Sequence, residues 1–129
     1  MTLRTVVYDR CVGHAGIAAL VDTRVYPDRL PEDVTYPAIT YIAPVSENGA
    51  TYRTHDGAGG RKESRVQFNS YAETGDGADA LADQIREAWD GYQSGCTVGR
   101  AFQVARRITR EDSLNVYRSI SDVMIEHSV

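Results

Sequence analysis

Three histidines and two cysteines are the residues of this sequence best suited to bind a metal ion or act as nucleophiles. His14, His55 and His127 never stand two or four residues apart, so no local pair can begin a zinc site. Cys11 and Cys96 lie far apart and form no C-x-x-C pattern. We therefore predict no metal site and no disulfide framework, and we interpret both cysteines as reduced structural residues.

The glycine-rich residues 57–64 come nearest to a phosphate-binding loop. They lack the G-x-x-x-x-G-K-[ST] spacing, and no hydrophobic strand leads directly into them. Arg61 and Lys62 could hold an anion beside flexible backbone amides, but a solvated loop is the favoured interpretation. The sequence also contains no G-x-S-x-G or Cys-His signature. We predict no catalytic residue and no cofactor, although a site assembled from distant positions stays open.

The length and composition of the chain indicate one domain, residues 1–129, that can bury a core without disulfides. The net charge of −4 makes the chain a poor candidate for binding phosphate backbones. No stretch approaches the roughly 18 apolar residues that a membrane-spanning helix needs, and no secretory signal is present. We expect a protein that does not contact membranes and is cytosolic when made.

The first third predicts one helix, then a connector and a strand. Apolar residues recur at three- and four-residue steps over residues 2–21, with His14 on the apolar stripe. Gly13 and Gly16 within this helix mark a close approach of another element, unless they weaken the helix. Prolines make residues 24–33 a connector without a strand. A strand follows over residues 38–43, with Ile39, Tyr41 and Ala43 on one face, and Pro44 ends it.

The remaining helices and strands are predicted from the spacing of hydrophobic residues along the chain. Residues 45–62 form a long polar loop, and residues 64–72 alternate as a half-buried strand. Asp76 is the expected N-cap of an amphipathic helix that contains Trp89. Two strands follow, over residues 98–108 and 116–126. In the last strand Ile120 and Met124 share one face, and Val123 and Ile125 share the other.

The predicted order is therefore α-β-β-α-β-β. The fold class is α+β, with an antiparallel or mixed four-stranded sheet and two helices packed on one face. The other face, rich in polar and aromatic groups, needs solvent or a neighbouring subunit.

Four segments, in this order, resemble the family of phage tail completion proteins that includes the tail terminators of siphophages. They are a helix ending in Ala19-Leu-Val-Asp with Arg24-Val-Tyr-Pro and Leu30-Pro after it; Tyr36-Pro-Ala-Ile-Thr-Tyr-Ile; His55-Asp-Gly leading into Arg65-Val-Gln-Phe-Asn-Ser-Tyr-Ala; and Ala78-Asp-Ala-Leu-Ala-Asp-Gln-Ile-Arg-Glu-Ala-Trp.

The resemblance implies a structural virion protein that is not an enzyme. It would form a homo-oligomeric ring, a hexamer, that caps the head-proximal end of the tail tube, ends tube polymerisation and forms the head-tail joining surface. The implied partners are further copies of itself, the tail tube protein and a head-completion or stopper protein, while DNA only passes through the lumen. Its location would be the virion neck, after assembly in the host cytoplasm.

Other interpretations stay open. The chain could be another neck ring protein, such as a head-completion or stopper subunit, or a small-ligand-binding or enzymatic α+β domain with a concave apolar pocket under the long loop.

The surfaces expected to contact partners are the long loop and the last strand. A ring requires that one surface of a subunit meet a different surface of its neighbour. The loop would act as a docking arm, and the last strand would supply apolar area that the helices leave uncovered. The candidate interface residues are Tyr52, Arg53, His55, Arg61, Lys62, Val116, Ile120 and Met124.

Overall fold

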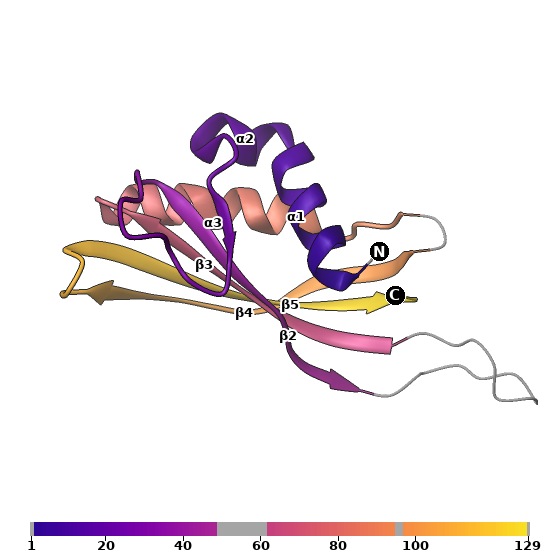
Figure 1. Ribbon diagram of the computed structural model, residues 1–129. Coiled ribbons are helices and arrows are strands. Elements are labelled where there is room, and N and C mark those ends of the chain that lie inside the picture. Colours follow the sequence, from indigo (N-terminus) through magenta and orange to yellow (C-terminus); the bar gives the residue numbers. More distant parts are fainter. Residues whose placement is uncertain (1, 49–61, 95–96, 129) are drawn as a thin grey trace, which may run out of the picture.

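The protein combines one mixed sheet with a layer of helices (Figure 1). The computed structural model describes residues 2–48, 62–94 and 97–128. These residues form α1 (Leu3–Gly13), α2 (Ala15–Val21), β1 (Val25–Pro27), β2 (Ala38–Asn48), β3 (Lys62–Ala72), α3 (Gly75–Trp89), β4 (Val98–Glu111) and β5 (Val116–His127). The strand order is β1-β2-β3-β5-β4, with β1 parallel to β2 and every other neighbouring pair antiparallel.

The core lies between the sheet and the helices, which all cover the same face. Helix α3 buries its apolar side chains at three- and four-residue steps, and Trp89 at its end is fully buried. The Trp89 ring stacks at a tilt on Phe68 of β3, with 5.8 Å between ring centroids. The predicted amphipathic pattern of this helix is confirmed, because the apolar stripe is what joins it to the sheet.

The predicted single helix over residues 2–21 is wrong, because the chain breaks into α1 and α2 at His14. His14 has extended backbone angles and is only half-buried, so it is not a core residue of one continuous stripe. The close approach expected at the glycines is confirmed at Gly16. A Cβ there would stand 1.8 Å from the Gln84 Oε1 of α3, whereas nothing lies within 4 Å at Gly13.

The predicted connector over residues 24–33 contains a strand. Val25–Pro27 pairs parallel to β2, with Val25 beside Ile39. The proline pattern hid this strand because it is short and lies at the edge of the sheet, where a proline removes no needed donor.

Pro44 does not end β2, contrary to prediction, and the strand continues to Asn48. A register shift between Ile42 and Ser46 accommodates the proline. Residues 45–48 and Lys62, expected in the long loop, therefore belong to β2 and β3, while residues 49–61 lie outside the described part of the chain.

Two further boundaries differ from prediction. The N-cap of α3 is Thr74, whose Oγ1 accepts from the Gly77 N–H at 3.0 Å, and Asp76 lies inside the first turn. Strands β4 and β5 end at Glu111 and His127, beyond their predicted ends.

The α+β class and the mixed sheet with helices on one face are confirmed, but the predicted element count is wrong. The described residues form three helices and five strands in the order α-α-β-β-β-α-β-β.

Candidate assembly surface

One face of the sheet carries no helix (Figure 1). Strand alternation turns Val123 and Ile125 of β5 into the core and places Ile120 and Met124 on the helix-free face, as predicted. Arg65, at the same position across the sheet as Met124, shares this face.

A band of side-chain hydrogen bonds crosses this face from β2 to β4. Asn69 of β3 donates to Thr40 Oγ1 of β2 at 3.2 Å. Arg118 of β5 donates to Asn69 Oδ1 at 2.9 Å and pairs with Glu111 of β4 at 2.8 Å. Gln67 donates to the same Asn69 oxygen at 3.2 Å. Thr40 and Asn69 are almost fully buried, so the band satisfies polar groups that would otherwise be costly to bury.

An apolar area lies on the same face, beyond the polar band. Met124 of β5 stands directly opposite Phe102 of β4, and both side chains are half-buried. The Arg100 guanidinium lies over the Phe102 ring, 5.2 Å from its centroid. Beside them, Arg65 and Asp122 form an ion pair at 2.9 Å. Half-buried apolar side chains framed by ordered polar groups are typical of surfaces that meet a partner.

The candidate interface residues are not all equally exposed. Val116 and Ile120 are 2% and 5% exposed and mainly support the fold, whereas Met124 keeps accessible area. Lys62 is exposed and pairs with Glu47 at 3.3 Å. Tyr52, Arg53, His55 and Arg61 lie outside the described residues. The structure brings Lys62 and Met124 to neighbouring strands of one sheet, and partner contact by all eight residues stays a prediction.

The sequence did not indicate which residues build the polar band. In the alternating strand over residues 64–72, Asn69 falls on the face opposite Phe68, and that is the available signal. The partners of Asn69 come from strands distant in sequence, so single-strand patterns do not pair them.

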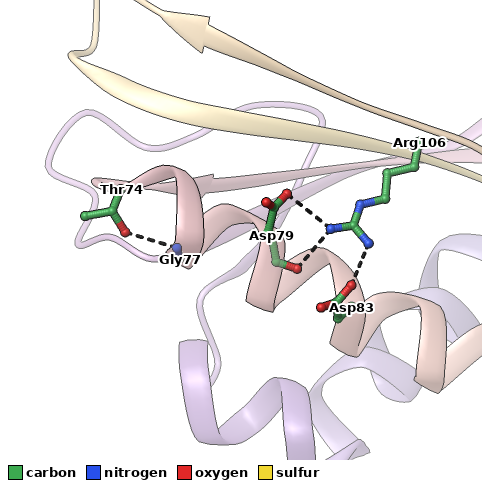
Figure 2. Close-up of polar contacts among 5 residues, drawn as sticks. All are labelled: Thr74, Gly77, Asp79, Asp83 and Arg106. Carbon is green, nitrogen blue, oxygen red and sulfur yellow. Dashed lines mark hydrogen bonds and ion pairs between the residues drawn. The ribbon is translucent and has the colours of Figure 1, made fainter.

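Arg106 joins the edge strand β4 to α3 on the opposite, helix-covered face (Figure 2). Its guanidinium reaches Asp83 Oδ1 at 2.6 Å and Asp79 Oδ1 at 3.2 Å. It also donates to the Asp79 backbone oxygen at 3.1 Å. The hydrogen bond with Asp83, aided by Asp79, raises the pKa of Arg106 above its ordinary value.

Three of the five His and Cys side chains, those of Cys11, His14 and His127, lie in the described part of the chain. Burial raises the pKa of the Cys11 thiol to about 12, so it is not a thiolate at neutral pH. His14 Nδ1 accepts from the Ile17 N–H at 3.4 Å, and His127 Nε2 lies 2.7 Å from Ser64 Oγ. Among the described residues, no three or more His, Cys, Asp or Glu side chains converge as metal ligands.

A shallow depression of about 330 Å³ lies between the start of α3 and the start of β2. Its apolar lining includes Leu20, Pro37 and Leu81. Glu73 adds one carboxylate. No described helix is long and apolar enough to cross a membrane.

The fold defines an α+β protein whose mixed sheet has helices on one face and none on the other. The profile of the family described as "Tail completion protein gp17" matches residues 5–127, and the chain belongs to this family of phage tail proteins. The predicted resemblance to phage tail completion proteins is thereby confirmed.

A solved structure shares the fold. It is a chain of the "Virion of native gene transfer agent (GTA) particle", similar with a TM-score of 0.78 and 18% sequence identity over 98% of this chain and 95% of that chain. No curated protein matches the sequence.

Proposed function

We propose that the protein is a tail terminator. A ring of its copies caps the head-proximal end of a phage tail tube, stops tube polymerisation and presents the surface to which the head attaches. The family match over residues 5–127 carries this proposal. The function requires no catalytic residue, metal or cofactor.

The helix-free face gives this proposal a physical basis. A ring subunit must present two different surfaces to its two neighbours and at least one more to the tube. The helices already cover one face of the sheet, while Phe102 and Met124 keep accessible area on the other. Cross-strand hydrogen bonds fix the side chains of the polar band beside this area, and fixed positions lower the entropy lost when a partner binds.

The proposed partners are copies of the same chain, the tail tube protein and a head-completion or stopper protein. DNA would pass through the lumen without binding, which agrees with a net charge of −4. The protein would assemble in the host cytoplasm and remain in the neck of the virion. The candidate interface residues, including those of 49–61, belong to this proposal.

Tube polymerisation with purified tail tube protein tests the function. The chain, added during growth, should stop elongation and appear as extra density at one end of each tube in electron micrographs. Particles made without the chain should carry tails of uncontrolled length and unattached heads. Tubes that grow unchanged, together with binding of the chain to heads instead, would replace the terminator with a head-completion or stopper role.

A further inference from the structure

A groove runs around one end of the sheet, where α3 begins and β4 turns into β5. This end lies away from both chain termini (Figure 1). Three hollows form the groove: the depression of about 330 Å³ beside α3, a second of about 280 Å³ and a third of about 340 Å³. Tyr36 lines all three, Glu73 lines the first two, and Leu114 lines the last two. Because the hollows share these residues, we treat them as one surface, the Tyr36 groove.

Apolar and aromatic side chains line the third hollow of the groove. Leu30, Val34 and Leu114 lie there together with the rings of Tyr36 and Tyr71. Burial and the nearby Tyr71 raise the pKa of Tyr36, which agrees with two phenol groups that lie close together. This lining suits apolar side chains of a partner.

The Tyr36 groove also holds carboxylates that the described chain leaves unpaired. Glu32 in the third hollow and Glu73 in the first two are exposed, and neither forms an ion pair with a described residue. Arg29 is the one basic residue among those that line the three hollows. The groove therefore fits a partner surface that places a basic group beside apolar side chains.

The outer part of β4 has this chemistry. The strand contains four arginines and one carboxylate, a net charge of +3, while the whole chain carries −4, so the residues outside β4 carry −7. Arg106 is bound to α3, and Arg110 pairs with Asp112. Arg107 is exposed and forms no ion pair with any described residue, so it is available to a partner.

Exposed apolar side chains are divided between the same two surfaces. Val104 and Ile108, on the outer part of β4, are 42% and 49% exposed, and Leu20 and Leu114 of the groove are 37% and 48% exposed. Val45 is the fifth large hydrophobic residue that stands exposed among the described residues, and it lies on neither surface. Exposed apolar area of this kind is typical of surfaces that a partner covers.

We propose that copies of this chain join through these two surfaces, with Arg107 and the outer part of β4 in one copy docked in the Tyr36 groove of the next. Charge favours this combination, because two β4 surfaces would bring arginines together and two grooves would bring carboxylates together. The contact uses two different surfaces, as a closed ring requires. The inference rests on the proposed ring function, specifies the contact between neighbours and leaves the area around Met124 for the tube.

Paired cysteines test this contact, both in capped tubes and in concentrated solution. All variants carry Cys96→Ser, and Cys11 is buried and does not compete for oxidation. Oxidation of a chain with both Val104→Cys and Leu114→Cys should give a ladder of covalent products that ends at the ring size. Ile108→Cys replaces Val104→Cys in a second chain, so that two positions on β4 are sampled.

The single variants are the matched controls. Val104→Cys or Leu114→Cys alone should give no ladder, and a mixture of the two should give covalent dimers only, because each contact needs one cysteine of each kind. Residues 104 and 114 cannot join within one copy, since the part of β4 beyond residue 104 spans about 23 Å and a disulfide needs Cα atoms within about 7 Å. Val45→Cys paired with Leu114→Cys uses an equally exposed residue outside both surfaces and should give no product. Rings in which neither β4 position joins to Leu114→Cys would overturn the inference.

An exchange of charges gives an independent measure. Arg107→Glu should lower the assembled fraction in sedimentation at least about tenfold, because it would face the carboxylates of the groove. Glu32→Arg should act in the same direction, and a chain with both changes should regain assembly, since the pair is restored with its signs reversed. Arg86→Glu makes the matched change at an exposed residue of α3, outside both surfaces, and should assemble normally. Losses from both single changes that the double change does not relieve would overturn the pairing of Arg107 with the groove.

The two proposals fail in different ways. Rings that cap tubes normally but yield no ladder and tolerate Arg107→Glu would overturn the contact between β4 and the groove and leave the terminator function standing. Covalent rings that form through this contact but never stop tube growth would overturn the terminator function alone.

Discussion

His14 shows how one side chain can end one helix and begin another. Its backbone leaves α1 in an extended conformation, and its ring accepts the Ile17 N–H at the start of α2. An N-cap acceptor satisfies a donor that the helix itself cannot pair. The ring must stay neutral at Nδ1 for this role.

Replacing His14 tests the cap and its pH dependence. Burial and the nearby positive Arg10 lower the pKa of His14 below 6.5, although Glu87 opposes them. As the pH falls through 6.5, the unfolded chain binds the proton first, so the stability that His14 contributes at neutral pH declines. Thermal denaturation from pH 7.5 to 5 should show His14→Asn retaining the cap with a weaker pH dependence.

The control is His14→Ala, which removes the acceptor. This variant should lose about 1 kcal/mol at pH 7.5. Equal stability of the alanine, asparagine and parent proteins would show that the ring does not cap α2.

The sequence predicted the apolar positions around His14 better than the role of His14 itself. Val7 and Cys11 before the break stand four residues apart, as do Ile17 and Val21 after it, and all four are buried. Periodicity reports which side chains face the core, but it does not register a single residue with extended backbone angles.

The first turn of α3 provides a comparison at the scale of the element. Thr74→Ala removes the acceptor of the Gly77 N–H and should cost about 1 kcal/mol in the free energy of unfolding. Asp76→Ala removes only a charge near the helix N-terminus and should cost less, about 0.5 kcal/mol. Urea denaturation of both variants measures the order, and a larger loss for Asp76→Ala would contradict the assignment of the cap.

The contact between β4 and α3 depends on Arg106 (Figure 2). Arg106→Ala should lower stability by about 1 kcal/mol, a small value because the Asp79 and Asp83 side chains are more than half exposed and solvent screens the pair. Arg107→Ala is the matched control on the same strand, since Arg107 forms no ion pair with the described residues, and stability should be unchanged. Equal effects of the two substitutions on urea denaturation would remove Arg106 as an anchor.

Element prediction succeeded where a pattern was long and failed where it was short or interrupted. The apolar stripe of α3 and the alternation around Phe68 were sufficient for those elements. β1 has three residues and a proline, and its strand character comes from pairing with β2, which no local pattern encodes. Pro44 is tolerated because, among the described residues, no strand pairs with the outer edge of β2 beyond Tyr41, and this is a property of the sheet.

The helix-free face is a property of the whole molecule, and Met124 tests its role. Met124→Asp places a charge in the apolar area, so capping of tubes in electron micrographs should be lost. The chain should still fold, with a stability loss of about 1 kcal/mol, because Met124 is only half-buried and faces away from the helices. Met124→Leu preserves volume and apolar character and should retain capping.

The two measurements on Met124→Asp have separate meanings. A folded variant that caps tubes normally would exclude this area from the assembly contacts. The sequence indicated Met124 as a surface residue, because it lies on the other face of the strand from Val123 and Ile125. It did not show that Ile120, on the same face as Met124, is buried and mainly stabilises the fold.

The strand order has a consequence for synthesis. β5 follows the other four strands in the chain, yet it lies between β3 and β4 inside the sheet. Until the ribosome has made residues 116–127, no strand joins β4 to β3. The hydrogen bond that Arg118 donates to Asn69 Oδ1 cannot form before then either. The sheet can therefore take up β4 only in chains translated through β5, so its last two strands are added together.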